Sequence, residues 1–158
     1  SFRPFAPSVL REDLKEWFDI NVDSPYMLLV GSINSEKKIE MTEEQKKLFG
    51  IDKLNLRRSD IPAVTHVDYS ARVQTVNEKN NKRYHDLISK FKEKTGCPVI
   101  VNTSFNVRGE PIVNTPTDAF NCFMGTELDL LVIGNFILDK KKQDSKFKKD
   151  YKSEFQLD

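Results

Sequence analysis

The stretch from Asn102 to Pro111, Asn-Thr-Ser-Phe-Asn-Val-Arg-Gly-Glu-Pro, gathers side chains of the kind that bind an anion. Hydroxyl groups donate to phosphate oxygens, an arginine binds them bidentately, and a glycine lets the backbone come close. The residues of interest are Asn102, Thr103, Ser104, Asn106, Arg108 and Gly109. Loops rich in Asn, Ser and Gly are also ordinary turns, so composition alone favours a plain turn. The spacing matches no Walker motif and no dinucleotide-binding fingerprint.

A second polar set occupies every other position of an apparently extended segment, which would place all five side chains on one face of a strand. The set is His66, Asp68, Ser70, Arg72 and Gln74. A solvated sheet surface explains such a pattern as well as a binding site does. These residue types can, however, both titrate and make directional hydrogen bonds. His66 with Asp68 offers two metal ligands but lacks a third at useful spacing, so we expect no metal site.

Arg3 is a third candidate, because Pro4 directly after it and Pro7 further along stiffen the backbone and can fix the direction of its guanidinium. A search for nucleophiles gives little. The sequence has no Gly-x-Ser-x-Gly motif and no Ser, His and Asp in a supported order.

The elements that must position these residues alternate between helix and strand in the second half of the chain. Residues 80–95 have apolar side chains at helical spacing and end at Gly96, which predicts a helix with a left-handed cap. Cys97–Val101 then predicts a buried, central strand that leads into the polar loop. Open sheets usually bind ligands at the carboxyl ends of their strands, so this position favours a binding role for the loop. Thr115-Pro116 predicts the start of a helix that runs to about Gly125.

The other elements follow from apolar spacing. Residues 8–18 predict a helix, residues 26–33 a strand, and the segment from Ile61 to Val76 ends in a strand. The highly charged residues 34–60 predict a surface excursion, and residues 128–138 a strand or hairpin. This order predicts an α/β or α+β fold, a twisted mixed sheet with flanking helices. We expect one domain over residues 1–139, followed by a lysine-rich tail over residues 140–158.

The composition limits the setting. Lys and Arg total 25 against 24 Asp and Glu, so the net charge of +1 provides no general attraction to nucleic acid or to a membrane. The longest apolar run is too short for a membrane helix, and no secretory signal is visible, so we expect a cytoplasmic protein. Cys97 and Cys122 have apolar neighbours and no Cys-x-x-Cys spacing, which predicts buried thiols.

Four blocks of the sequence together resemble the carboxyl-terminal domain of the O-carbamoyltransferases, a family of nodulation-factor and antibiotic-tailoring enzymes. They occur in the family's order and, with the segment that follows, extend from Phe2 to about Leu138. The blocks are Phe2–Leu10, Ser24–Met27, Pro62–Val76 and Asn102–Val113. The resemblance implies a domain similar to the threonylcarbamoyl-adenylate synthases, which in the whole enzyme follows an amino-terminal domain of the actin-like type.

The resemblance also implies a carbamoyltransferase activity. This domain would bind ATP, with Mg²⁺, and carbamoyl phosphate to form carbamoyl-adenylate, and the actin-like domain would complete transfer to a hydroxyl group. Ser104-Phe-Asn106 matches the Ser-x-Asn element of the synthases, whereas the lysine of their Lys-x-Arg element is absent from this sequence. The implied roles are phosphate binding for Asn102, Thr103, Ser104, Asn106 and Arg108; charge stabilisation for Arg3, Arg72 and Arg108; and contact with the carbamoyl end or the neighbouring domain for His66, Asp68, Ser70 and Gln74.

Two other functions stay open at this point. The absent lysine, the abrupt start, which suggests a fragment of a longer protein, and the charged residues 34–60 are also compatible with a non-catalytic nucleotide-binding or docking module of a larger assembly. Binding of double-stranded RNA is a weaker alternative, because phosphate-backbone binding normally needs a clustered basic face. Only residues 140–152 could supply one. The acceptor substrate and the oligomeric state cannot be read from this sequence.

Overall fold

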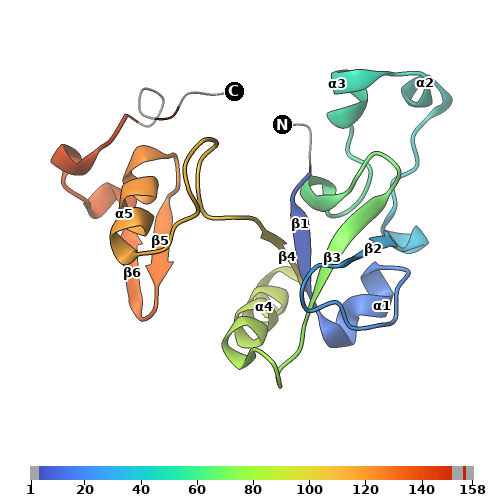
Figure 1. The fold of residues 1–158 in the computed structure, drawn as a ribbon. Coiled ribbons are helices and arrows are strands. Elements are labelled where there is room, and N and C mark those ends of the chain that lie inside the picture. Colours follow the sequence, from blue (N-terminus) through green and yellow to red (C-terminus); the bar gives the residue numbers. More distant parts are fainter. Residues whose placement is uncertain (1–3, 151–154, 156–158) are drawn as a thin grey trace. The chain divides into compact units, whose positions relative to one another are not determined.

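The structure is a computed structural model that describes residues 4–150 and residue 155. It divides into two compact units, with the boundary between Thr103 and Ser104 (Figure 1). The fold is mixed α/β, with a four-stranded mixed sheet in unit 1 and a two-stranded hairpin in unit 2. The predicted fold class is therefore confirmed. Within the described residues, no helix is long and apolar enough to span a membrane.

The sheet of unit 1 has the strand order β2-β3-β1-β4. Its strands are β1 (Ala6–Leu10), β2 (Leu29–Ser32), β3 (Ser70–Val76) and β4 (Val99–Asn102). The two inner strands, β1 and β3, run parallel, and each outer strand is antiparallel to its inner neighbour. The prediction that β4 is central was wrong, because it pairs only with β1 among the described strands, and Val101 is half exposed.

One face of this sheet carries the main core. Alternation points Val9, Ala71, Val73 and Val99 to the same side, where they are buried. They pack against α1 (Leu14–Trp17), the following Phe18 and the loop before β3. Gly31 in β2 lies close to Ile20, since a Cβ atom there would be 2.8 Å from Ile20 Cγ2. A side chain at position 31 would therefore collide with the packing beneath the strand.

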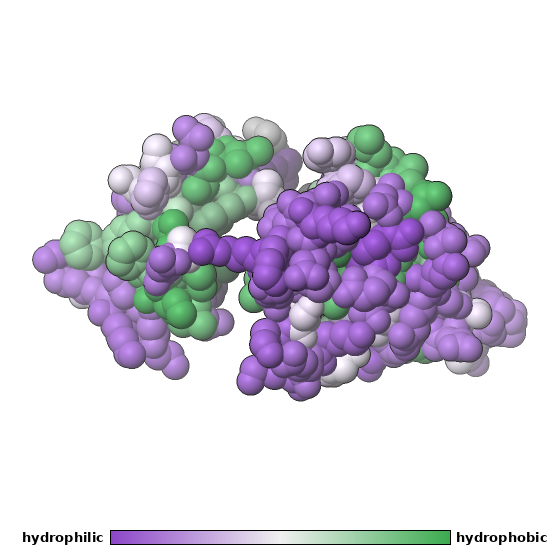
Figure 2. All heavy atoms as spheres, turned by 90° about the horizontal axis from the view of Figure 1, so that it is seen from below, coloured by the Kyte–Doolittle hydropathy of each residue, from purple (hydrophilic) through white to green (hydrophobic). Residues whose placement is uncertain are grey.

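The opposite face is divided. At one end, α4 (Lys82–Thr95) covers Leu10 and Val76 through Ile88, which is fully buried. The helix begins at the Asn81 cap and ends at Gly96, whose φ of 76° confirms the predicted left-handed cap. The other end of this face carries the polar residues of β3. The side of unit 1 seen in Figure 2 is mostly hydrophilic.

The helix predicted over residues 8–18 was wrong in its first part. Ser8 lies in β1, a short 3-10 turn follows at Arg11–Asp13, and only Leu14–Trp17 is α-helical. All five residues of β1 are buried, so the strand shows no polar alternation. A strand buried on both faces gives a continuous apolar run, which by chance extended the helical spacing of Leu14, Trp17 and Phe18.

Residues 34–60 contain α2 (Glu43–Lys46) and α3 (Gly50–Leu54), both short, after a 3-10 turn at Ser35–Lys37. Most of this excursion is exposed, as predicted, but its end is anchored. Arg58 is 4% exposed and donates to the carbonyl oxygens of Lys53 at 2.6 Å and Thr65 at 3.3 Å. The charged composition of residues 34–60 did not predict that Arg58 is buried.

Unit 2 consists of α5 (Pro116–Gly125) packed on the hairpin of β5 (Leu130–Ile133) and β6 (Phe136–Asp139). Thr115 and Asp118 form a capping box at the start of α5, which confirms the predicted helix start. Phe123 and Leu131 form the centre of the small core. After the hairpin, 3-10 turns occur at Lys140–Lys142 and Ser145–Phe147, and Phe147 stacks edge-on against Phe120.

Candidate functional site

Gln74 joins three strands on the polar part of the unit 1 sheet. Its Oε1 accepts hydrogen bonds from Ser8 Oγ in β1 and from Asn102 Nδ2 in β4, each at 2.6 Å. Its Nε2 donates to the carbonyl oxygen of Pro25 at 3.0 Å. Ser8 is fully buried, whereas Gln74 and Asn102 are half-buried. The cluster therefore fixes the direction of both carboxamides at the edge of an open surface.

His66, Asp68 and Ser70 also come together, but not as alternate residues of one strand. The chain turns at residues 66–69, where Tyr69 N donates to His66 O, and His66 N then donates to Ser70 O. Tyr69 has a φ of 64°, which is uncommon for a residue with a Cβ. Because of this turn, the Ser70 hydroxyl lies 2.9 Å from His66 Nδ1 and 2.7 Å from Asp68 Oδ1.

The hydrogen bonds from the side chain and backbone of Ser70 lower the pKa of the Asp68 carboxyl group. Asp68 is therefore a carboxylate at neutral pH and can only accept hydrogen bonds. Arg72 is the next residue on this side of β3, and its side chain is exposed. Within the described part of the chain, Arg72 forms no ion pair. Arg72 is thus a cation with no carboxylate partner among residues 4–150, beside an ordered polar cluster.

The polar loop of unit 2 is closed by its own hydrogen bonds. Asn106 Nδ2 donates to the Glu110 carbonyl oxygen at 2.8 Å, and Val107 N donates to Glu110 Oε2 at 2.9 Å. The Glu110 N–H in turn donates to Val107 O, which makes residues 107–110 a tight turn. Gly109 has a φ of 82°, as the third residue of a type II turn requires.

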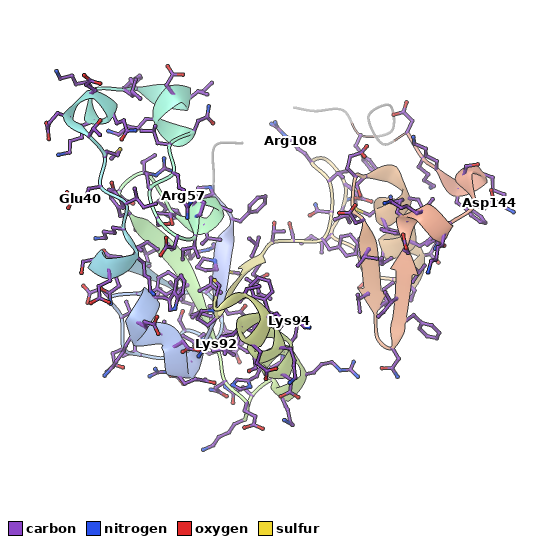
Figure 3. All side chains as sticks on the ribbon, turned by 180° about the vertical axis from the view of Figure 1, so that it is seen from behind. Glu40, Arg57, Lys92, Lys94, Arg108 and Asp144 are labelled. Carbon is purple, nitrogen blue, oxygen red and sulfur yellow. The ribbon has the colours of Figure 1, made fainter. Side chains whose placement is uncertain are left out.

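Arg108 is the second residue of this turn, and its exposed side chain extends away from the ribbon at the loop tip (Figure 3). Below the turn, the Glu110 carboxylate also interacts with the thiol of Cys122 in α5. Burial, with a further contribution from Glu110, raises the pKa of Cys122 to about 11. The thiol is therefore protonated at neutral pH.

The structure distributes the predicted site residues over both units. Arg3 lies outside the described residues. Unit 1 contains Asn102 and Thr103 with the turn and strand residues His66, Asp68, Ser70, Arg72 and Gln74. Unit 2 contains Ser104, Asn106 and Arg108; Ser104 is exposed, and Asn106 serves in loop closure. The loop predicted as one continuous cradle is therefore shared between two compact units.

Sequence reasoning missed two residues of these clusters. Ser8 was expected at the start of the helix predicted over residues 8–18, and its role as a partner of Gln74 depends on the pairing of β1 with β3. Glu110 lies within the predicted loop but was given no role. Its spacing of three residues from Val107 fits a side chain that bonds back to a turn amide, so a local signal existed.

Metal binding by protein side chains alone has no support in the described residues, since no group of three or more His, Cys, Asp or Glu could hold an ion there. The described part of unit 2 also has a cleft of about 500 Å³ beside the hairpin. Lys140, Lys141 and Lys148 line it together with Glu127, Asp129 and Asp139. None of the predicted site residues lines this cleft, and its three lysines are balanced by three acidic residues.

Comparison with known proteins supplies the family. The sequence pattern of the carbamoyltransferase C-terminus matches residues 1–140. The chain belongs to this family. It is 35% identical over 117 residues to a 3'-hydroxymethylcephem-O-carbamoyltransferase of Amycolatopsis lactamdurans, covering 74% of this chain and 18% of the relative. The predicted resemblance to the carboxyl-terminal domain of the O-carbamoyltransferases is confirmed.

Two further relatives illustrate the range of this carbamoyltransferase family. The nodulation protein NolNO of Sinorhizobium fredii is 38% identical over 143 residues, covering 89% of this chain and 18% of the relative. An uncharacterized protein of Synechocystis is 54% identical over 163 residues, covering 100% of this chain and 26% of the relative. The chain thus spans about a quarter or less of the length of these relatives.

Proposed function

We propose that this carbamoyltransferase C-terminal domain forms carbamoyl-adenylate from ATP and carbamoyl phosphate. The observation that supports it most is the family membership, with relatives whose names specify O-carbamoyl transfer. In this proposal, a domain of the actin-like type elsewhere in the full-length protein transfers the carbamoyl group to a hydroxyl acceptor. Such a domain would lie in the part of the relatives that this chain does not cover.

The chemistry balances with one water molecule. Water cleaves carbamoyl phosphate to carbamate and inorganic phosphate, and a carbamate oxygen then attacks the α-phosphorus of ATP. A new O–P bond forms, the bond to the β-phosphate oxygen breaks, and pyrophosphate leaves. Negative charge grows on the phosphoryl oxygens during this attack, so fixed cationic donors lower the barrier.

Arg72 is the donor that the geometry of unit 1 supports best, because its guanidinium is exposed and has no acidic partner among the described residues. Asn102 is the last residue of β4 and is oriented by Gln74, and Thr103 follows directly after the strand. In unit 2, Ser104 and Arg108 are exposed on a closed loop and are available to phosphate oxygens. Mg²⁺ would arrive with the nucleotide, held by its phosphates, since Mg²⁺ usually keeps several water ligands at such sites.

The test is release of pyrophosphate from ATP, Mg²⁺ and carbamoyl phosphate, together with calorimetric binding of ATP. We expect Arg72→Ala and Arg108→Ala each to weaken ATP binding about 10-fold or more, since hydrogen bonds to charged groups contribute about 1.5–3 kcal/mol. Lys94→Ala on α4 is the control for loss of one exposed positive charge, and its affinity should equal that of the wild type. Unchanged binding in both arginine variants would disprove their assignment.

The result also separates enzyme from docking module. Pyrophosphate release by the chain supports adenylate formation. If the full-length protein transfers carbamoyl groups while ATP never reacts with loss of pyrophosphate, the proposed reaction is wrong. Nucleotide binding without any turnover, in both the chain and the full-length protein, would instead favour a binding module.

A further inference from the structure

The hydroxyl group of Ser70 determines which nitrogen of His66 carries the proton. Ser70 Oγ has one hydrogen and lies 2.7 Å from Asp68 Oδ1, an ionised carboxylate that can only accept. The Ser70 hydrogen therefore goes to Asp68. The hydrogen bond from Ser70 N to the same carboxylate oxygen, at 3.0 Å, holds that oxygen in place.

With its hydrogen committed, Ser70 Oγ can only accept from His66 Nδ1, which lies 2.9 Å away. Nδ1 must then carry a hydrogen. In a neutral imidazole the other nitrogen, Nε2, is left with a lone pair and acts as an acceptor. No described residue donates to Nε2, and the half-buried ring has limited freedom to turn.

The ring of His66 is held on the polar side of β3. Ser70, Arg72 and Gln74 alternate along the strand and share one face, and the ring of His66 is bonded to Ser70 on that face. Neighbouring same-face residues of a strand are about 7 Å apart. Ser70, the hydrogen-bond partner of His66, is such a neighbour of Arg72. A neutral acceptor with an arginine nearby suits a small molecule with an N–H at one end and a phosphate at the other.

We infer that Asp68 and Ser70 hold His66 as the Nδ1–H tautomer, so that Nε2 accepts a hydrogen bond from the amide N–H of the carbamoyl group. This inference rests on the proposed function and identifies the group that recognises carbamoyl phosphate as distinct from other acyl phosphates. Acetyl phosphate has the same charge but a methyl group in place of the amide. A site built to bond a donor discriminates against an analogue without it, because the acceptor then gains no hydrogen bond from the ligand. Asp68 and Ser70 are positioning residues in this arrangement.

The chain has two histidines, so nitrogen NMR with labelled histidine reads the tautomer directly. The second, His85, has its Nε2 2.7 Å from Glu12 Oε1, and His85→Gln assigns the signals. At a pH of about 8, well above the ordinary histidine pKa of about 6.5, we expect His66 to show the Nδ1–H pattern. Ser70→Ala and Asp68→Ala should yield mixed tautomers, and Ser70→Thr, which keeps the hydroxyl, should restore the pure one. An Nε2–H pattern in the wild type, or no change in Ser70→Ala, would overturn the tautomer assignment.

Titration with two probes tests recognition. Carbamoyl phosphate should shift the Nε2 resonance of His66, and acetyl phosphate should not. In competition experiments we expect the wild type to prefer carbamoyl over acetyl phosphate and His66→Ala to reduce that preference about 10-fold. Equal shifts with both probes, or no shift with either, would refute the inference whatever the enzyme does. Absence of pyrophosphate release with an intact Nε2 response would instead count against the proposed reaction alone.

Discussion

The carboxamide of Asn102 donates a 2.6 Å hydrogen bond to Oε1 of Gln74, 28 residues away along the chain. The same oxygen accepts from the buried hydroxyl of Ser8. One glutamine therefore links the two inner strands to the strand that leads into the polar loop. Fold stability and site geometry depend on the same side chain.

Gln74→Ala should lower the free energy of unfolding by about 1–3 kcal/mol, because the substitution leaves the buried Ser8 hydroxyl and the Pro25 carbonyl without a partner. Urea denaturation measures this difference. Arg72→Ala is a matched control on the same strand face, since Arg72 is exposed, and its effect should stay within about 0.5 kcal/mol. Equal stabilities of the two variants would contradict the role of Gln74.

Arg58→Met should destabilise the chain by about 2–3 kcal/mol, because two backbone carbonyls lose a charged donor in a buried position. The neighbouring Arg57 is largely exposed and pairs loosely with Asp60 at 3.7 Å, so Arg57→Met should cost less than about 1 kcal/mol. Thermal or urea unfolding distinguishes the variants. Proteolysis of residues 34–60 should accelerate in Arg58→Met and remain slow in Arg57→Met.

Gly109→Ala should open the turn that carries Arg108. Its φ of 82° costs a residue with a Cβ about 1–2 kcal/mol, whereas asparagine tolerates this region better. We expect faster hydrogen exchange of the Val107 amide, which is bonded to Glu110, and weaker binding of ATP. Gly109→Asn should lie closer to the wild type in both measurements. An alanine variant with unchanged exchange would show that the turn does not depend on this glycine.

The thiol of Cys122 predicts a pH dependence. Its pKa is raised from 9.0 to about 11 in the folded chain, so folding favours the protonated form. The stabilising contribution is complete below pH 9 and is lost as the pH rises towards 11. Cys122→Ala should reduce the fall in unfolding free energy between these values. A slope unchanged by the substitution would assign the loss to other groups, such as the lysines.

The same shift predicts slow alkylation. At pH 8 the thiolate fraction of Cys122 falls from about a tenth to about a thousandth, so reaction with iodoacetamide should be about 100-fold slower than for an ordinary thiol. The Cys97→Ala variant isolates the rate of Cys122. Denaturant should restore the ordinary rate, which serves as the internal control.

The elements with strong local signals were predictable from the sequence. The helices α4 and α5 have capping residues at their starts, and Gly96 ends α4 in the left-handed conformation. The strand β1 was missed because burial on both faces removes alternation, and the position of β4 at the sheet edge depends on pairing that no local pattern encodes. Long-range strand pairing, not local propensity, determines both the formation of β1 and the edge position of β4.

The candidate site shows the same division. Alternation correctly predicted that Ser70, Arg72 and Gln74 share a face, since that follows from the geometry of any strand. It failed at His66 and Asp68, where the positive φ of Tyr69 turns the chain instead of extending it. The turn still brings His66 and Asp68 to Ser70. The predicted proximity of these side chains is therefore right, but it results from a turn and not from alternation along a strand.

Gly31 also has an evolutionary consequence. A Cβ atom at this position would lie 2.8 Å from Ile20 Cγ2. We therefore expect a larger residue at position 31 only in sequences with a smaller side chain at position 20. The two positions are thus expected to change together or not at all as sequences diverge. Val30, which precedes Gly31 and is 60% exposed, carries no such restriction and is free to vary alone.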